Sequence, residues 1–254
     1  MNQTTKRKIW TETFRVRSYE PGPSGTISFA TITGYLQETA ANHARHLGFS
    51  IYDLAPQQLT WVLLRLRISL TTFPRWQDTV HIETWPAALD SRFAYRDWLL
   101  FDQNRQLVGK ATSTWIMIHL KTRRPVPPPQ RILHFHPPDR PRVFTDNQWP
   151  RIKPPQAAKP LGEQPIRVLR SDIDMNQHVN STRYVDWALD ALPDSIVLQQ
   201  PATLYIEFRA ESHQGDNLLS CVYPHPQHSN AYLHALTSES SQRTLAIGQT
   251  LWGN

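Results

Sequence analysis

The strongest constraint on the fold is that the chain carries the same order of elements twice, a helix followed by several strands. Asp78 and Asp216 lie 138 residues apart, and each ends a turn before a strand. Trp115 and Trp252 lie 137 residues apart, and each falls in the last predicted strand of its half. Self-similarity at a fixed spacing indicates a duplicated structural unit. A curved antiparallel sheet wrapped around a helix buries the apolar stripe of that helix, so we predict an α+β protein with two such units.

The spacing of apolar residues defines the elements of each half. Apolar residues recur at helical spacing from Phe29, and Gly48 is placed to end that helix. The same spacing predicts a second helix over residues 181–192, which Pro193 ends. Alternation of polar and apolar residues predicts strands. These cover 64–70, 79–85, 93–101 and 107–120 in the first half, and in the second half 204–210, two strands beginning at Leu218 and Ala231, and a last strand ending at Trp252.

A proline-rich segment separates the two halves. Residues 125–160 contain 11 of the 21 prolines, and proline cannot donate a hydrogen bond to a sheet. We therefore predict an N-terminal domain over 1–124, a linker over 125–160 and a C-terminal domain over 161–254. Apolar residues in the linker indicate that it packs on a surface. The linker and its flanks are also basic, which leaves two interpretations open: a solvated connection, or a docking face for an acidic protein.

The densest polar stretch precedes the second helix. Asp174, Asn176 and His178 stand at i, i+2 and i+4, so in an extended segment their side chains would share one face. Asn180 is a good N-cap for the helix that follows. Free N–H groups and a positive dipole at that helix start suit a site where negative charge develops on an oxygen. A polar turn that only caps a helix has the same spacing, so this alternative stays open.

Charge and composition exclude several classes of protein. The chain of 254 residues begins MNQTTKRKIW and shows neither a secretory signal nor an apolar run long enough to span a membrane. We therefore expect a cytoplasmic protein. The net charge of +6 suits an acidic partner, but no nucleic-acid-binding motif is present. The single cysteine, Cys221, excludes an internal disulfide.

Five long segments carry a family resemblance. They are RSYEPGPSGTISFATITGYLQETAANHA, WVLLRLRISLTTFPRWQDTVHIETW, RDWLLFD with ATSTWIMIHLKTRRP, SDIDMNQHVNSTRYVDWALD, and LYIEFRAESHQGD. The chain resembles, nearly end to end, the acyl-[acyl carrier protein] thioesterases of plant plastids and bacteria. The resemblance implies two tandem hot-dog domains, in which the first shapes acyl-chain specificity and the second carries the catalytic residues.

The resemblance also implies an activity and a partner. The expected reaction is hydrolysis of fatty acyl-[acyl carrier protein] (acyl-ACP) thioesters to a free fatty acid and the holo carrier protein, which ends fatty acid synthesis. The expected partner is the acidic acyl carrier protein with its acyl-phosphopantetheine arm. No cofactor and no metal are expected, and a homodimer stays open.

Catalytic roles carry over from the family by position. They fall on Asp174, Asn176, His178 and Glu211, while the place of a family cysteine holds Ser212. An imidazole with a pKa of about 6.5 can take a proton from water near neutrality. We expect His178 or Glu211 to be that base, Asp174 to orient the imidazole, and Asn176 to orient the water or donate to the carbonyl oxygen.

The acyl chain needs an apolar tunnel, which the family resemblance assigns to the first domain. The candidate lining residues are Thr39, His43, Trp61 and Leu64. Each is equally well explained as core, and for His43 we prefer a buried, hydrogen-bonded core histidine.

Other functions stay open. An acyl-CoA thioesterase and a hot-dog enoyl hydratase would use similar residues, and an acyl-carrier-binding module would bind without turnover. Cys221, His225 and His228 have ligand-like spacing, as do His134 and His136, but no fourth ligand is evident and we predict no metal site.

Overall fold

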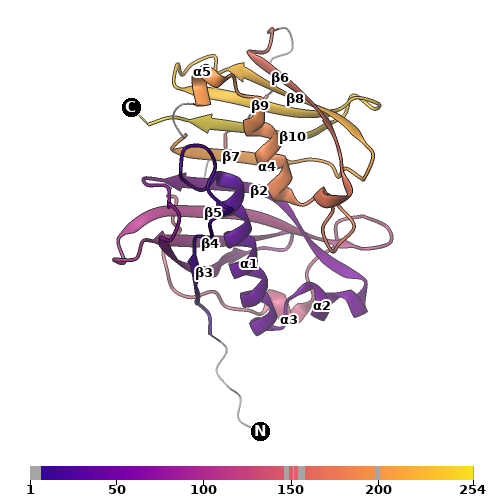
Figure 1. The fold of residues 1–254 in the computed structure, drawn as a ribbon. Coiled ribbons are helices and arrows are strands. Elements are labelled where there is room, and N and C mark those ends of the chain that lie inside the picture. Colours follow the sequence, from indigo (N-terminus) through magenta and orange to yellow (C-terminus); the bar gives the residue numbers. More distant parts are fainter. Residues whose placement is uncertain (1–6, 146–148, 151, 154–157, 198–200, 254) are drawn as a thin grey trace. The chain divides into compact units, whose positions relative to one another are not determined.

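The computed structural model describes residues 7–145, 149–150, 152–153, 158–197 and 201–253 (Figure 1). These residues form two compact units. Within the described residues, unit 1 comprises 7–28, 32–64 and 71–145, and unit 2 comprises 29–31, 65–70 and those from 149 onward. The division between the units falls inside the proline-rich segment. None of the described helices has the length and apolar character needed to cross a lipid bilayer.

Unit 1 is a long helix packed on an antiparallel sheet. Its elements are β1 Trp10–Arg15, α1 Phe29–Leu47 from Ile32 onward, α2 Ile51–Leu54, a 3₁₀ turn Ala55–Gln57, the first half of β2 Leu59–Leu70, β3 Thr79–Leu89, β4 Phe93–Phe101, β5 Leu107–His119 and α3 Gln130–Leu133. The strand order is β1-β3-β4-β5, with β2 next to β5. Tyr35 of α1 stacks on Phe14 of β1, with ring centroids 4.4 Å apart. Ile32 and Leu36 are fully buried, which confirms the predicted apolar stripe of α1.

Unit 2 repeats this arrangement with a shorter helix. Its elements are β6 Gly162–Arg167, a 3₁₀ turn Arg170–Asp172, α4 Ser181–Asp190, α5 Asp194–Val197, β7 Thr203–Phe208, β8 Asn217–Pro224, β9 Ala231–Ser238 and β10 Thr244–Leu251. The second half of β2, Arg65–Leu70, pairs with β7, and the order continues β10-β9-β8-β6. Helix α4 contacts β9, β8 and β6, and it buries Tyr184, Val185, Trp187 and Ala188. The predicted α+β architecture with two repeated units is therefore confirmed.

The edge strands extend the repeat beyond what the sequence pattern indicated. β1 pairs with β3 from Trp10 opposite Thr84. In unit 2, β6 pairs with β8 from Gly162 opposite Val222. Both are six-residue antiparallel strands at the edge of their unit's sheet. Neither strand was predicted, so each unit has one more strand than expected.

The second helix ends earlier than predicted. Helix α4 stops at Asp190, with Ala191 as its C-cap, and does not reach residue 192. The cause is Pro193, which disfavours helical backbone in the residue before it. At the other end the prediction holds, because Asn180 Oδ1 accepts a hydrogen bond from Thr182 N at 2.9 Å.

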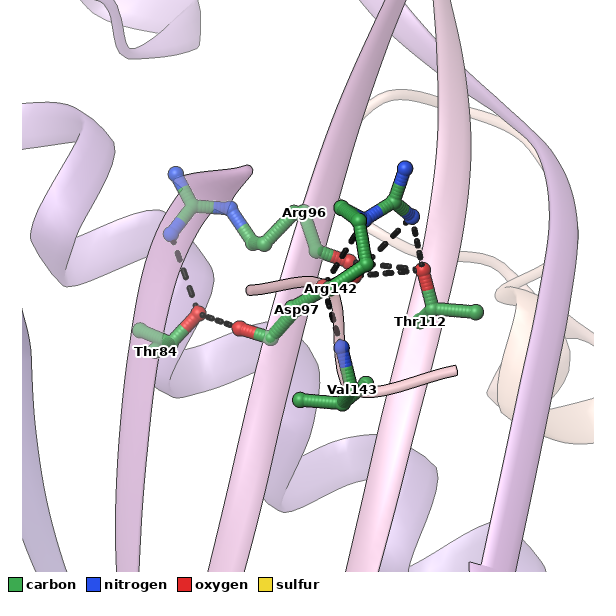
Figure 2. Close-up of polar contacts among 6 residues, drawn as sticks. All are labelled: Thr84, Arg96, Asp97, Thr112, Arg142 and Val143. Carbon is green, nitrogen blue, oxygen red and sulfur yellow. Dashed lines mark hydrogen bonds and ion pairs between the residues drawn. The ribbon is translucent and has the colours of Figure 1, made fainter. Parts of the chain in front are cut away.

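The part of the proline-rich segment that belongs to unit 1, residues 125–145, packs on the sheet of that unit, and Arg142 is one of its anchors. Figure 2 shows Arg142 holding the buried Asp97 through two hydrogen bonds, from Nε at 2.9 Å and Nη2 at 3.1 Å. Thr112 Oγ1 and the Val143 backbone also donate to this carboxylate, at 2.6 and 3.0 Å. The ion pair and these hydrogen bonds offset the cost of removing the carboxylate from water. The expected packing of this segment on a surface is therefore confirmed.

Candidate active site

The polar stretch before α4 forms a closed turn. A β-bridge between Ile173 and Val179 joins the two ends of the segment. Asp174 N donates to His178 O at 2.8 Å, and Gln177 N donates to Asp174 O at 3.0 Å. Gln177 has φ 64°, in the left-handed region that this tight turn requires. The assumption of an extended segment was wrong, so the three polar side chains are gathered by a turn and not by strand alternation.

Asp174 and Asn176 stabilise this turn together. Asp174 Oδ1 accepts a hydrogen bond from Asn176 N at 2.7 Å. The Asn176 side-chain amide lies 3.4 Å from Asp174 Oδ2. A carboxylate that accepts from the backbone two residues later is a standard way to hold such a turn. The Asn176 side chain is exposed, so its amide is accessible to a ligand.

His178 faces Glu211. The distance from His178 Nδ1 to Glu211 Oε2 is 3.5 Å, and the side chains are 27% and 36% exposed. Glu211 does not belong to a strand, since β7 ends at Phe208. The predicted strand 204–210 is thus too long at its end, and strand alternation does not explain where Glu211 points. The structure brings together an imidazole and a carboxylate that are 33 positions apart in the sequence.

A second imidazole borders the pair. The ring of His213 meets the ring of His178 edge-on, with centroids 5.6 Å apart. His213 N donates to Asp216 Oδ2 at 2.8 Å, which fixes the turn that leads into β8. We did not predict His213 as a site residue. The available signal was its position two residues after Glu211 in an irregular segment.

Two buried contacts hold the parts of the site in place. The Asp172 carboxylate accepts from Leu169 N and Arg183 Nε, both at 2.8 Å, and its backbone oxygen accepts from Asn180 N at 2.9 Å. It thereby ties the start of the turn to the start of α4. Tyr184 Oη donates to Ser212 Oγ at 2.9 Å, which ties α4 to the segment that carries Glu211. Ser212 is fully buried, and its hydroxyl serves to hold this segment against α4.

Two of the predicted substrate-binding residues are hydrogen-bonded within the interior of unit 1. Thr39 Oγ1 donates to Tyr35 O at 2.7 Å. Arg96 Nη1 donates to His43 Nδ1 at 3.1 Å, so His43 carries its proton on Nε2 and donates it to Arg7 O at 2.9 Å. Burial, and then the neighbouring Arg96 charge, lower the pKa of His43 to about 3. These contacts favour the interpretation of His43 as a core residue.

The other two candidates are partly accessible. Trp61 Nε1 donates to Phe49 O at 3.1 Å, and its ring packs against a small cluster in unit 1. Leu64 is half-buried. All four candidates belong to unit 1, whereas the four predicted catalytic residues belong to unit 2.

Comparison with known proteins identifies the family. The model of the acyl-ACP thioesterase N-terminal domain matches residues 7–134, and the model of the C-terminal domain matches residues 156–254. The chain belongs to the acyl-ACP thioesterase family. Within this family it is 34% identical over 227 residues to the chloroplastic oleoyl-acyl carrier protein thioesterase 2 of Arabidopsis thaliana, covering 81% of this chain and 60% of that protein. It is 30% identical over 274 residues to thioesterase 1 of the same plant, covering 95% and 75%.

Solved structures of the thioesterase family share the fold. An acyl-ACP thioesterase from Bacteroides thetaiotaomicron superposes with a TM-score of 0.84 at 26% identity, covering 96% of this chain and 97% of that one. The 12:0-ACP thioesterase from Umbellularia californica gives a TM-score of 0.85 at 24% identity, covering 97% and 98%. The predicted fold of tandem hot-dog domains is thereby confirmed. The chain spans only 60 to 62% of the first chloroplastic relatives that it matches.

Proposed function

We propose that this thioesterase family member hydrolyses fatty acyl-ACP thioesters to a free fatty acid and the holo carrier protein. The observation that carries the proposal is the approach of His178 Nδ1 to Glu211 Oε2, 3.5 Å apart in unit 2. Two family-matched domains and relatives named as oleoyl- and palmitoyl-acyl carrier protein thioesterases support the choice of substrate.

The geometry suggests a division of roles. In this scheme the imidazole of His178, with the Glu211 carboxylate beside it, takes a proton from water. The resulting hydroxide attacks the thioester carbonyl carbon, and an oxyanion forms. Its collapse breaks the carbon–sulfur bond, and the departing thiolate recovers the proton from the imidazolium. Glu211 stabilises the imidazolium, and the exposed amide of Asn176 is available to donate to the oxyanion.

Asp174 has a positioning role in this scheme. Its carboxylate accepts from Asn176, so it presents the amide rather than acting on substrate. This differs from the expectation that Asp174 orients the imidazole directly. For the acyl chain, Trp61 and Leu64 are better placed than Thr39 and His43, because their side chains are partly accessible.

The direct test is a panel of saturated acyl-ACP thioesters from eight to eighteen carbons. Thiol release is followed with a chromogenic disulfide, and free fatty acid is measured by mass spectrometry. The proposal expects equal amounts of thiol and fatty acid for at least one chain length. Preference for acyl-CoA over acyl-ACP would support the acyl-CoA thioesterase alternative. Addition of water to an enoyl thioester without thiol release would support the hydratase, and tight binding without any product would support the non-catalytic module.

A further inference from the structure

A pocket in unit 1 is built without any residue of the candidate active site. Its volume is about 400 Å³, which is within the range of small-molecule sites. Three parts of the sequence form its walls: the segment before β1, the end of α1, and α3 with the residues that follow it. Every described residue that lines it belongs to unit 1, and none is a candidate acyl-chain residue. The pocket is therefore large enough for a ligand and has no role in the reaction described above.

Part of the pocket wall is apolar. Leu47, the last residue of α1, is buried and lines the pocket. The rings of Phe49 and Phe135 also line it, and they meet edge to face with centroids 5.6 Å apart. Phe49 packs against a buried cluster that includes Ile132 of α3, which supports this wall from behind. A ligand that lies on the wall therefore gains affinity by burying apolar surface.

Basic side chains form the polar part of the same pocket. Lys8, Arg131, His134 and His136 all line it, and all four are exposed. Arg131 Nη2 donates to Asp53 O at 3.2 Å, which uses one of the five N–H donors of the guanidinium and holds it next to α2. The ammonium group and the imidazoles are further donors. This set of side chains favours an anionic group in the pocket.

Acidic side chains do not cancel this charge within the pocket. Among the described residues that line it, none is aspartate or glutamate. Asp53 directs its carboxylate to Ser50 N and Oγ, at 2.9 and 2.6 Å. Asp139, three positions after His136, is exposed but does not line the pocket. The one lysine and one arginine therefore give the lining a net charge of +2 with both histidines neutral.

The end of α1 does not oppose an anion strongly. Gly48 has φ 77°, and its N–H donates to Arg45 O at 3.1 Å. Phe49 N donates to Ala44 O at 2.8 Å. These bonds occupy two carbonyl groups of the last turn, as is usual where glycine ends a helix. A negative group in the pocket therefore meets fewer free carbonyl oxygens than it would at an uncapped helix end.

We propose that this pocket binds a free fatty acid, with its carboxylate at Lys8 and Arg131 and its chain on Leu47, Phe49 and Phe135. The inference rests on the proposed function, because that reaction releases the fatty acid. A carboxylate forms charge-assisted hydrogen bonds with ammonium and guanidinium groups, whereas the thioester of the substrate is neutral. The pocket thereby distinguishes the product of the reaction from its substrate.

The test measures the binding of decanoate by isothermal titration calorimetry. An amide analogue of decanoyl-pantetheine saturates the acyl site, so that only binding elsewhere is measured. One decanoate should still bind per chain. K8E/R131E should weaken this binding about tenfold, and decanol should bind about tenfold more weakly than decanoate, because each change removes the charge pairing. Phe135→Ser should weaken it about fivefold by removing apolar contact.

A matched control makes the same change of charge outside the pocket. Arg92 and Arg105 are exposed in the β3–β4 and β4–β5 turns of unit 1 and do not line it. R92E/R105E should leave the affinity for decanoate unchanged. Equal weakening by the two double variants, or no binding once the amide is present, would overturn the proposal. Complete displacement of decanoate by an equal concentration of inorganic phosphate would also overturn it, because the chain would then add nothing. K8Q/R131Q replaces the reversal variant if circular dichroism shows that the latter does not fold.

Calorimetry separates this inference from the proposed function because it requires no turnover. Decanoate binding that depends on Lys8 and Arg131, in a protein that releases no thiol from any acyl-ACP, would support the pocket and refute the proposed reaction. Hydrolysis of acyl-ACP, together with decanoate binding that K8E/R131E does not change, would refute only the pocket.

Discussion

The turn before α1 in unit 1 and the turn before α4 in unit 2 have the same backbone frame but different side chains. Gly22 N donates to Thr26 O at 3.0 Å, as Asp174 N donates to His178 O at 2.8 Å. The bridge that closes the first turn, between Pro21 and Ile27, corresponds to the bridge between Ile173 and Val179.

The supporting contacts repeat as well. The carboxylate of Glu20 accepts from Arg17 N at 2.7 Å, and that of Asp172 accepts from Leu169 N at 2.8 Å. At the repeat spacing of 138 residues, Phe73 is the residue of unit 1 that corresponds to Glu211 of unit 2. Both units therefore have the same turn backbone. Of the two, only unit 2 has a histidine at this position with a carboxylate facing it.

The largest effect should come from substituting alanine for His178 in the turn of unit 2, compared with the same substitution at the corresponding position of unit 1. His178→Ala should lower kcat/KM about 10³-fold, because it removes the proposed base. Thr26→Ala changes the corresponding position of unit 1 and should leave kcat/KM within twofold. Steady-state kinetics with acyl-ACP measures both, and circular dichroism confirms folding. Near-normal turnover by His178→Ala would refute the assignment of the base.

A smaller effect distinguishes His178 from Glu211. If Glu211 only stabilises the imidazolium, Glu211→Gln should lower kcat about 10²-fold and still leave activity that rises with pH. If Glu211 removes the proton, the loss should equal that of His178→Ala and the pH dependence should vanish. The pH profile of kcat for the variant decides between these outcomes. Glu239→Gln, at an exposed position in the turn after β9, is the control for removing a carboxylate.

A buried histidine in each unit should make the protein less stable in acid. Burial lowers the pKa of His43 in unit 1 to about 3 and that of His234 in unit 2 to about 4. In the unfolded chain each histidine binds a proton below about pH 6.5. Between that pH and the lowered pKa the unfolded state binds more protons, so stability falls as pH falls. Each histidine should reduce the free energy of unfolding by about 2 kcal/mol between pH 7 and pH 5.

Urea unfolding at pH 7 and pH 5 measures this loss. His234→Gln should remove the contribution of His234 to this loss of unfolding free energy. This requires that the glutamine amide keeps the contacts of the imidazole to Ala188 O and Thr250 Oγ1. If the unfolding free energies of the variant at pH 7 and pH 5 differ as much as those of wild type, His234 is already protonated in the folded protein at pH 5. His43→Gln extends the comparison to unit 1.

The elements that could be predicted are those whose pattern is local. The bounds of α1 and the cap at Asn180 follow from apolar spacing and from one capping side chain. β6 was missed because Gly162–Arg167 has little alternation and contains Pro165, which an edge strand tolerates. Its pairing with β8 is a long-range contact with no local signal.

The geometry of the candidate site could not be predicted from the sequence. The family motif indicated His178 and Glu211, yet their approach depends on a pairing of segments that lie 33 positions apart. The backbone of the turn before α4 was misjudged because its left-handed residue is Gln177, and glutamine does not indicate a left-handed position as glycine does. His213 was missed because only its contact with the His178 ring reveals it.

The smallest effect concerns this left-handed position. Unit 1 has Gly25 there, with φ 74°, whereas unit 2 has Gln177, with φ 64°. A side chain in left-handed backbone costs about 1 kcal/mol, and the entropy of glycine in the unfolded chain offsets part of that. Gln177→Gly should therefore stabilise the protein by about 0.5 kcal/mol. Gly25→Gln should destabilise it by about 0.5 kcal/mol, because a Cβ at Gly25 meets no neighbouring atom and the same two contributions act with opposite sign.

The two substitutions together show whether backbone strain at Gln177, in the turn before α4, contributes to activity. Glycine at 177 should loosen the turn and let His178 turn away from Glu211, so kcat should fall about threefold while the melting temperature rises slightly. Gly25→Gln should lower the melting temperature without changing kcat, because its turn carries no reacting group. Differential scanning calorimetry and kcat with acyl-ACP measure the two quantities on the same samples. If Gln177→Gly lowers both stability and kcat, the glutamine side chain makes a stabilising contact and backbone strain does not account for its presence.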